Sequence, residues 1–344
     1  MAHNVDNPAH PIALQLARAT SVDQVQQAAM LIDALVIQLH IGGTSVEHIA
    51  QQVCDLNAKV FARLWSLLAP AELVSRSCLV VMGSEGRAEQ VFKTDQDNAL
   101  LLCDGEDPGA LEPLAQRFIA ALMDCGYPRC PGNIMLSNPL WRQPVAGFKQ
   151  ALREWMFGAD PQGPMRLAIF LDAVTVAGDA SLLAQATRFV HEHVVDNDAF
   201  FARFARAADQ FSEPRGWWQR LTGARDEPPF DLKKLGTFPI VHGVRALALQ
   251  HHVAAVPTTE RLRGLVEGER LPAQTARQLA EALHVLMTLK LENNLGQSTR
   301  GEPLDNLIRL SALSAPQRAQ LQAGQAVIKR FRQTLREHFK LDAL

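Results

Sequence analysis

Two aspartates, Asp95 and Asp97, interrupt an apolar stretch that extends from Leu79 to Leu102. Residues two apart on a strand point to the same face, so the sequence predicts that the two carboxylates project side by side. Adjacent carboxylates repel each other, and a bound cation offsets that repulsion. Mg²⁺ binds one or two protein carboxylates and fills its remaining positions with water and substrate phosphates. The pair is therefore a candidate site for Mg²⁺ or Mn²⁺.

A second candidate site lies upstream, where the apolar segment CLVVM ends at Gly83 and Ser84. The following segment, SEGRAEQ, is typical of a short helix, and the first N–H groups of a helix have no partner within it. Those N–H groups and the Ser84 hydroxyl would bind a phosphate. Gly83 allows the backbone to approach a ligand closely, and Arg87 could add a charge-assisted contact. The sequence thus predicts a phosphate cradle beside the aspartates.

The order of these features is more informative than either feature alone. Ten residues separate Ser84 from Asp95, so a strand, a Gly-Ser turn and an Asp-x-Asp strand would meet at one edge of a sheet. A phosphate cradle beside a metal site suits nucleotidyl transfer, in which two metal ions would bridge a nucleoside triphosphate. The alternative is structural, because a Gly-Ser pair is common and an isolated Asp-x-Asp often forms a turn or a solvated strand end. The chain has no Gly-x-x-x-x-Gly-Lys-Ser/Thr segment, which gives no support to a P-loop NTPase.

The elements that would position these residues follow from the apolar pattern. Apolar residues recur at spacings of three and four between Val22 and Leu39, and again between Ile49 and Leu67, which predicts a helical hairpin. Two glycines after Ile41 would end the first helix, and Thr44 with Glu47 would form a capping box that begins the second.

The pattern of apolar residues changes near Ser77, where short apolar runs typical of buried strands replace the helical periodicity. These runs are CLVVMG, NALLLCDG and RLAIFLDAVTVAG, with a helix predicted at LEPLAQRFIAALMDCG. The helical period returns after Ser181 and continues to the end, where Ser314 and Gln317 predict a capping box. We therefore expect an α+β fold with a mixed sheet, divided into a helical region (1–70), a central domain (71–190) and a helical domain (191–344).

Four segments in order carry a resemblance to a known family. They are GSEGRAEQVFKTDQDNALLL, CPGNIMLSNPLWRQ, FLDAVTVAGD and DLKKLGTFPIVHGVRALAL. Together they resemble the DUF294-type nucleotidyltransferases, which are often fused to CBS domain pairs and are related to the PII uridylyltransferase within the DNA polymerase β-like superfamily. The resemblance implies a polymerase β-like core in the middle of the chain and a substrate-binding helical domain after it. It covers most of the chain from the second helix onward.

The resemblance also assigns roles to individual residues. Gly83 and Ser84 match the superfamily's Gly-Ser pair, and Asp95 and Asp97 match its metal-binding aspartates. The third carboxylate comes from a later strand in that superfamily. The resemblance implies a strand at CPGNIM as one place for it, but that segment contains no acid, and Asp172 is the candidate here. Residues 1–75 do not show the alternating strands and helices of a CBS pair.

Other residues have both a functional and a structural interpretation. Arg142 could hold a phosphate while Trp141 stacks on a base, or the tryptophan could simply cover the core. Lys233, Lys234 and His242 could reach a triphosphate if the helical domain closes over the active edge, and an ordinary solvated basic face is the alternative. Two adjacent tryptophans, Trp217 and Trp218, are expected to pack against the helical domain rather than to form an exposed patch for a partner.

Composition limits the partners. Lys plus Arg is 34 and Asp plus Glu is 36, so a net charge of -2 provides no overall basic field for nucleic acid. The sequence contains no apolar run long enough for a membrane span, and we expect a cytoplasmic protein without membrane partners. Its five cysteines are expected to be small buried residues, and Cys125 and Cys130 could alternatively face one another as a thiol pair.

These observations favour a Mg²⁺-dependent nucleotidyltransferase that moves a nucleoside monophosphate from an NTP to a hydroxyl of a protein or small molecule. The resemblance points to a PII-like protein acceptor. The alternative is a catalytically silent nucleotide-binding regulatory protein. A nucleic-acid polymerase is least favoured, because such an enzyme needs a basic channel and stacking aromatics.

Overall fold

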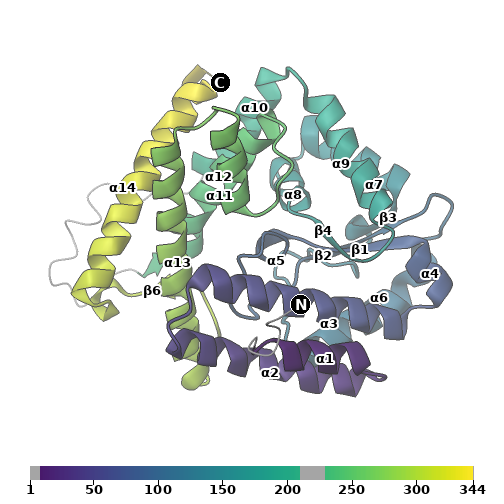
Figure 1. Cartoon of the computed structure of the whole chain (residues 1–344). Helices are drawn as coiled ribbons and strands as arrows, with labels where there is room; N and C mark the ends of the chain where they lie inside the picture. Colours follow the sequence, from purple (N-terminus) through teal and green to yellow (C-terminus); the bar gives the residue numbers. More distant parts are fainter. Residues whose placement is uncertain (1–7, 210–228, 344) are drawn as a thin grey trace. The chain divides into compact units, whose positions relative to one another are not determined.

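The chain forms two compact units, Met1–His193 and Val194–Leu344. The computed structural model describes residues 8–209 and 229–343. Trp217 and Trp218 lie outside the described residues, so the expectation for them stays a prediction. Figure 1 shows the elements of each unit along the chain.

The first unit begins with three helices, α1 (His10–Arg18), α2 (Val22–Ile41) and α3 (Val46–Leu68). The helix α2 lies against both α1 and α3, and Figure 1 shows α2 and α3 side by side. Gly43 follows α2 with a φ of 74°, the left-handed conformation that ends a helix. Ser45 caps α3 by accepting a hydrogen bond from the His48 N–H, so the predicted cap at Thr44 is wrong by one residue.

A four-stranded sheet follows, in the order β3-β2-β1-β4. Its strands are β1 (Ser77–Val81), β2 (Asn98–Leu102), β3 (Arg142–Pro144) and β4 (Val174–Gly178). The strand β1 pairs antiparallel with β2 on one side and with β4 on the other, and β2 pairs parallel with β3. The fold is therefore α+β with a mixed sheet, as the sequence predicts.

All residues of β1 and β2 are buried, as expected for strands whose two faces are both covered. The helix α3 contacts β1 and β4, and α7 (Val145–Phe157) contacts β2 and β3. Aromatic rings join α3 to α6 (Glu112–Asp124), because Phe61 and Trp65 both pack edge-to-face on Phe118. The N-terminal helices thus share a core with the sheet within one unit.

Two segments differ from the predicted strands. The segment CPGNIM forms no strand and runs as a loop beside β2, where the Asn98 N–H donates to the carbonyl of Ile134. The residues RLAIF belong to a helix, α8 (Gly163–Phe170), and only the end of that apolar run forms β4. A short apolar run fits a buried helix as well as a strand, and periodicity alone does not separate the two.

The second unit is mostly helical. Its long helices α13 (Ala273–Thr299) and α14 (Ala315–His338) pack side by side (Figure 1). Ser314 and Gln317 form the predicted capping box at the start of α14. The shorter elements of the unit are α10 (Asp198–Ala205), a two-stranded sheet of β5 (Phe230–Asp231) and β6 (Leu307–Ile308), a π-helical turn η5 (Leu232–Thr237), α11 (Phe238–Gln250) and α12 (Thr258–Glu267).

The remaining helices belong to the first unit. They are α4 (Ala71–Ser75), α5 (Gly83–Gly86) and α9 (Ala180–Val194), of which α9 ends at the boundary between the units. Among the described residues, no helix combines the length and the apolar character that crossing a membrane requires.

Candidate functional site

The topology of the sheet brings the Gly-Ser turn and the aspartate pair to one edge of the sheet. Because β1 is antiparallel to both neighbours, the end of β1 lies beside the starts of β2 and β4. Val81, the last residue of β1, pairs with Asn98 in β2 and with Val174 in β4. Gly83 and Asp97 therefore lie at this edge next to each other.

Gly83 and the side chain of Asp97 are in close contact. A Cβ atom on Gly83 would lie 2.5 Å from Oδ2 of Asp97, closer than two such atoms can approach. Gly83 also has a φ of 60°, in the left-handed region that favours glycine. The backbone of Met82 continues the strand pairing, because its N–H donates to the Asp97 carbonyl at 2.9 Å. The backbone of Asp97 is thus hydrogen-bonded to the residue before the Gly-Ser turn, and its side chain lies close to Gly83.

The Gly-Ser turn opens α5, the short helix that the sequence predicts. The helix ends in two hydrogen bonds, from the Ala88 N–H to the Glu85 carbonyl and from the Glu89 N–H to the Ser84 carbonyl. This pattern is a Schellman cap, in which a glycine normally occupies the left-handed position. Here that position holds Ala88, with a φ of 55°. Ala88 is thus locally strained in this turn, because its backbone has a conformation that favours glycine.

Asp95 and Asp97 precede β2 rather than belonging to it, which corrects the predicted strand position. Both are partly exposed, and Gln96 between them is buried. The Gln96 side chain points inward, where its amide donates to the Tyr127 carbonyl at 3.0 Å. The alternation expected of extended chain is therefore present, and the two carboxylates share the outer side.

A third carboxylate, Glu85, lies near the pair, and the sequence analysis did not identify it. Glu85 is buried, and its Oε2 accepts a hydrogen bond from Asn57 Nδ2 at 3.0 Å. Its other oxygen, Oε1, is buried and accepts no hydrogen bond from the described residues. Burial raises the pKa of Glu85 to about 8, and the negative charges of Asp95 and Asp97 add to this effect. The sequence feature that could have identified Glu85 is its position directly after Gly83 and Ser84.

The network beneath Glu85 is buried and polar. Asn57 on α3 accepts a hydrogen bond from the Tyr127 hydroxyl at 2.6 Å and donates to Glu85. Burial raises the pKa of the Tyr127 hydroxyl well above its usual value, so this group stays a donor at neutral pH. The helix α3 and the loop at Tyr127 thereby fix the position of Glu85.

The residues present fit a divalent cation bound by two carboxylates. Asp95 and Asp97 are partly exposed on the same side of the chain, and their negative charge acts on Glu85, a repulsion that a bound cation would offset. In the described parts of the chain, no three histidine, cysteine, aspartate or glutamate side chains converge to hold a metal. Mg²⁺ does not require a third protein ligand, because water and substrate phosphates complete its coordination.

Asp172 does not lie beside the aspartate pair as the sequence predicts. It precedes β4, on the far side of β1 from Asp97, and two strand spacings correspond to roughly 10 Å. Its Oδ2 accepts a hydrogen bond from Arg87 Nη1 at 2.6 Å, and its side chain is fully buried. We therefore leave Asp172 out of the metal-binding set.

Arg87 is occupied by two carboxylates. Besides Asp172, it contacts Glu89, with Nε 2.7 Å from Oε2. Burial disfavours the charged guanidinium, but the neighbouring charges of Glu89 and Asp172 outweigh it and raise the pKa of Arg87. Arg87 thus links the end of α5 to the start of β4, and its contact with a phosphate stays a prediction.

Arg142 serves the fold rather than a ligand. Its three nitrogens donate to the Pro108 carbonyl at 2.9 Å, to the Leu136 carbonyl at 2.6 Å and to Glu112 Oε2 at 2.5 Å. The side chain is only 2% exposed. The neighbouring Trp141 is also buried and packs on Trp155, with ring centroids 5.1 Å apart, so the interpretation of Trp141 as a core residue is correct.

In the second unit, His242 is fully buried. Its Nε2 donates to the Phe204 carbonyl at 2.7 Å, and its Nδ1 accepts from Arg245 at 3.3 Å. These contacts give His242 a structural role within the unit, not the predicted contact with a triphosphate. Lys233 and Lys234 are both exposed on η5, and their role in phosphate binding stays a prediction.

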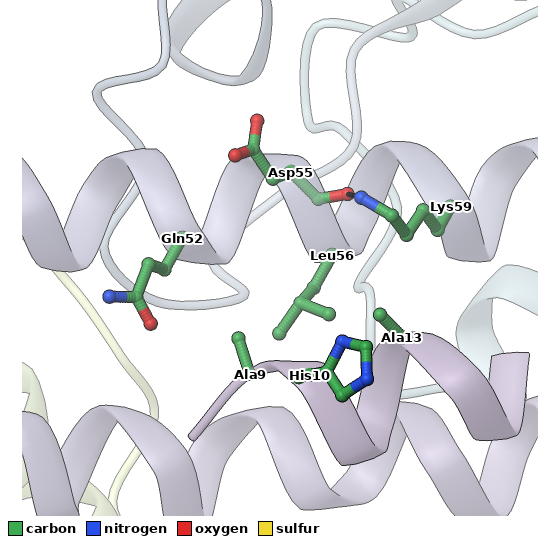
Figure 2. A pocket seen from close by; sticks show the side chains of 7 residues that line it. All are labelled: Ala9, His10, Ala13, Gln52, Asp55, Leu56 and Lys59. Atoms are coloured by element: carbon green, nitrogen blue, oxygen red, sulfur yellow. Dashed lines mark hydrogen bonds between the residues drawn. The ribbon is translucent and has the colours of Figure 1, made fainter. Parts of the chain in front are cut away.

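The structure also contains a cavity of about 230 Å³ between α1 and α3 (Figure 2). Its lining consists of Ala9, His10, Ala13, Gln52, Asp55, Leu56 and Lys59. None of the residues at the sheet edge lines this cavity. The convergence of Gly83, Asp95 and Asp97 therefore locates the candidate site better than cavity size does.

Two family models match the chain, one in each unit. A family model described as "Putative nucleotidyltransferase DUF294" matches residues 31–162, and one described as "Putative nucleotidyltransferase substrate binding domain" matches residues 198–339. The first match includes Gly83, Asp95 and Asp97, and Asp172 lies outside it. No curated protein matches the chain. The two matches cover both units in the expected order, and the chain therefore belongs to the DUF294 nucleotidyltransferase family.

Proposed function

We propose that this chain transfers a nucleoside monophosphate from an NTP to a hydroxyl group, with Mg²⁺ or Mn²⁺ bound at Asp95 and Asp97. One observation carries the proposal, namely the contact between Gly83 and the Asp97 carboxylate at the sheet edge. A phosphate on the Gly-Ser turn and a cation on the carboxylates would then occupy one site. The family membership supports the same reaction class.

Each residue at the edge has a role in this reaction. The Ser84 hydroxyl and the first N–H groups of α5 would bind the terminal phosphates, and the absence of a side chain at Gly83 leaves room beside Asp97. The acceptor hydroxyl gives its proton to water, its oxygen bonds to the α-phosphorus, the bond from that phosphorus to the bridging oxygen breaks, and pyrophosphate leaves with the electron pair. The bound metal ions would supply positive charge for the triphosphate and lower the pKa of the acceptor hydroxyl.

We place acceptor recognition in the second unit, because residues 198–339 match a substrate-binding domain. The exposed Lys233 and Lys234 on η5 are candidates for contact with an anionic group there. The resemblance to the PII uridylyltransferase favours UTP as the donor and a PII-like protein as the acceptor. The five free cysteines are compatible with a reaction in the cytoplasm.

One observation favours a second candidate, a silent nucleotide-binding regulatory protein. Asp172, the predicted third carboxylate, is paired with Arg87 and separated from Asp97 by β1. Two carboxylates without a third could bind a metal-nucleotide complex and leave the acceptor hydroxyl unactivated. This candidate predicts Mg²⁺-dependent NTP binding without any product.

Mass spectrometry of the acceptor distinguishes the two candidates. The full chain is incubated with Mg²⁺, each of the four NTPs in turn, and either a PII-type protein or a cell extract. Transfer predicts an acceptor heavier by one nucleoside monophosphate with wild-type protein and none with the Asp95→Asn/Asp97→Asn variant. NTP binding measured by calorimetry without any mass increase would favour the regulatory protein instead.

A further inference from the structure

One face of the helix α2 is both exposed and apolar. The opposite face packs against α1, α3 and α6, and its buried residues are Val25, Ala28, Ala29, Ile32, Leu35, Val36 and Leu39. On the exposed face, four large side chains, Met30, Leu31, Ile37 and Ile41, have exposed fractions of 64%, 42%, 44% and 80%. The outer face of a surface helix is normally polar, and a helix that is apolar all round is normally buried. The exposed face of α2 is therefore a candidate docking surface.

The apolar residues of this face follow the spacing of a coiled coil. Met30, Ala34, Ile37 and Ile41, which we call the outer stripe, recur at spacings of four, three and four, and Ala34 is exposed like the others. Apolar residues with this spacing pack against a second helix that has the same spacing. None of the exposed residues from Met30 to Ile41 is charged. The outer stripe therefore fits an apolar helix rather than a nucleic acid or another highly charged partner.

The outer stripe is complementary to itself. If two α2 helices pack antiparallel about a two-fold axis at the middle of the stripe, Ala34 lies opposite Ile37 of the second copy. The first and last residues of the stripe lie opposite each other in the same way. A small side chain then faces a larger one at the centre, which allows the two helices to interdigitate. On the flanks, Asp33 lies beside His40 of the second copy, so no two acidic groups meet across the pair.

The area of the exposed face fits a weak interface. Its four large side chains expose on the order of 400 Å² in total, a patch of the size that is often functional on a monomer. A standard stable interface buries about 800 Å² on each copy. The exposed side chains of Gln27 and Gln38 flank the stripe and would extend the contact beyond the apolar patch.

We propose that two copies of this chain pair through the outer stripes of antiparallel α2 helices. Because the interface is small, the dimer is reversible, with a dissociation constant in the micromolar range. The pairing is independent of the proposed function, because no residue of the candidate site belongs to the stripe. Its test therefore needs neither a nucleotide nor a metal ion.

Analytical ultracentrifugation of the full chain tests the inference, over concentrations from about 1 µM to about 300 µM. We expect the wild-type chain to change from monomer to dimer over this range. Ile37→Lys places a charge at the centre of the stripe and should weaken the dimer by about 30-fold or more, the loss typical of a central interface residue. Phe157→Lys is the matched control, because Phe157 on α7 is also 44% exposed, and this variant should associate as wild type does.

Two results of this experiment would overturn the inference. A wild-type chain that stays monomeric over the whole range would do so and would leave the stripe to a different protein. An Ile37→Lys variant that dimerises with wild-type affinity would do so as well, because the pairing would then use another surface.

A mixture of two variants tests whether the stripe contacts itself. In the antiparallel pair, Ile37 of one copy lies roughly 4.5 Å along the helix axis from Ile37 of the other, so long side chains at this position can meet. We expect Ile37→Lys and Ile37→Glu each to stay monomeric and an equal mixture of them to form a dimer. Circular dichroism checks that both variants are folded, as their exposed position predicts. A mixture of folded variants that stays monomeric would overturn the pairing.

A disulfide measurement tests the antiparallel orientation. Chains that carry Ala34→Cys are mixed with chains that carry Ile37→Cys and are treated with a mild oxidant. Peptide mass spectrometry distinguishes the new disulfides from any that involve the native cysteines. Antiparallel pairing predicts a disulfide between the two variants in preference to disulfides between identical chains. A preference for identical chains would overturn the antiparallel arrangement.

Discussion

Gly83 and Asp97 lie in contact at the edge of the sheet, where a Cβ atom on Gly83 would come within 2.5 Å of Asp97 Oδ2. This contact joins the Gly-Ser turn to the aspartate pair, although the two segments belong to different strands. It places the turn and the aspartates beside each other, as the proposed site requires.

The substitution Gly83→Ala tests this contact. The added methyl group would displace the Asp97 carboxylate, and we expect transferase activity to fall by about 100-fold or more, as for other small misplacements of reacting groups. Gly43→Ala is the matched control, because Gly43 also has a positive φ of 74° but nothing within 4 Å of its added Cβ. Steady-state kinetics and thermal unfolding of both variants separate the effect on Asp97 from backbone strain. Equal activity in the two variants would contradict the account.

The strained cap at Ala88 predicts a stabilising substitution. A residue other than glycine in the left-handed region destabilises the folded protein by about 1–2 kcal/mol, and glycine removes this strain. Glycine also gives the unfolded chain more conformational freedom, which lowers the free energy of unfolding by about 0.4–1 kcal/mol. We expect Ala88→Gly to raise the free energy of unfolding by about 0.5–1 kcal/mol, measured by urea denaturation. A lower free energy of unfolding would mean that Ala88 makes favourable contacts that outweigh its strain.

The pair of Arg87 and Asp172 should matter for stability more than for chemistry. Breaking a buried ion pair from one side typically costs about 3–5 kcal/mol, and we expect Asp172→Asn to lower the free energy of unfolding by that order. Replacing all three partners, as in Arg87→Met/Asp172→Leu/Glu89→Gln, should recover most of the loss, because no charge of this cluster is then left without its partner. Glu260→Gln is the control, because the exposed pair of Glu260 and Arg263 should contribute less than about 1 kcal/mol.

Activity measurements on the same variant decide the role of Asp172. We expect Asp172→Asn to retain most of its activity per folded molecule. Full loss of activity at unchanged stability would instead make Asp172 a catalytic carboxylate, as the sequence predicts.

The buried Glu85 predicts a pH dependence of stability. Its pKa is about 8 in the folded protein against an ordinary value of 4.5, so the folded state binds more protons between these values. Stability from this group is fully present below about pH 4.5 and declines as the pH rises to about 8. We expect Glu85→Gln to flatten this decline, because a neutral amide keeps a hydrogen-bond acceptor for Asn57. Urea denaturation at pH 5, 7 and 9 measures the difference, and parallel curves for both proteins would contradict it.

Features set by local sequence were predictable. The stripes of α2 and α3 and the capping box of Ser314 and Gln317 depend on residues within one or two turns of each other. The cap of α3 marks the limit of this approach, because Thr44 and Ser45 are both good caps and the local pattern does not choose between them. The Gly-Ser turn and its closeness to the aspartate pair were also predictable from local order along the chain, and their binding of phosphate and metal stays a prediction.

Features set by distant partners were not predictable. Arg142 looked like a ligand contact, but Pro108 and Glu112, some thirty residues upstream, bury it. Asp172 was excluded from the aspartate pair only by the strand order, which places β1 between the two positions. Glu85 was overlooked because its closeness to Asp95 and Asp97 depends on how α5 turns after β1.

The most direct test of the account follows the label from an α-³²P NTP. When wild-type protein is incubated with Mg²⁺, an acceptor and the α-labelled NTP, the acceptor should become labelled. The same incubation with a γ-labelled NTP should leave the acceptor without label. The Asp95→Asn/Asp97→Asn variant should transfer no label, and an Asp104→Asn/Asp107→Asn variant outside the site should transfer as wild type does. Transfer by the Asp95→Asn/Asp97→Asn variant at the wild-type rate would contradict the assignment of the site.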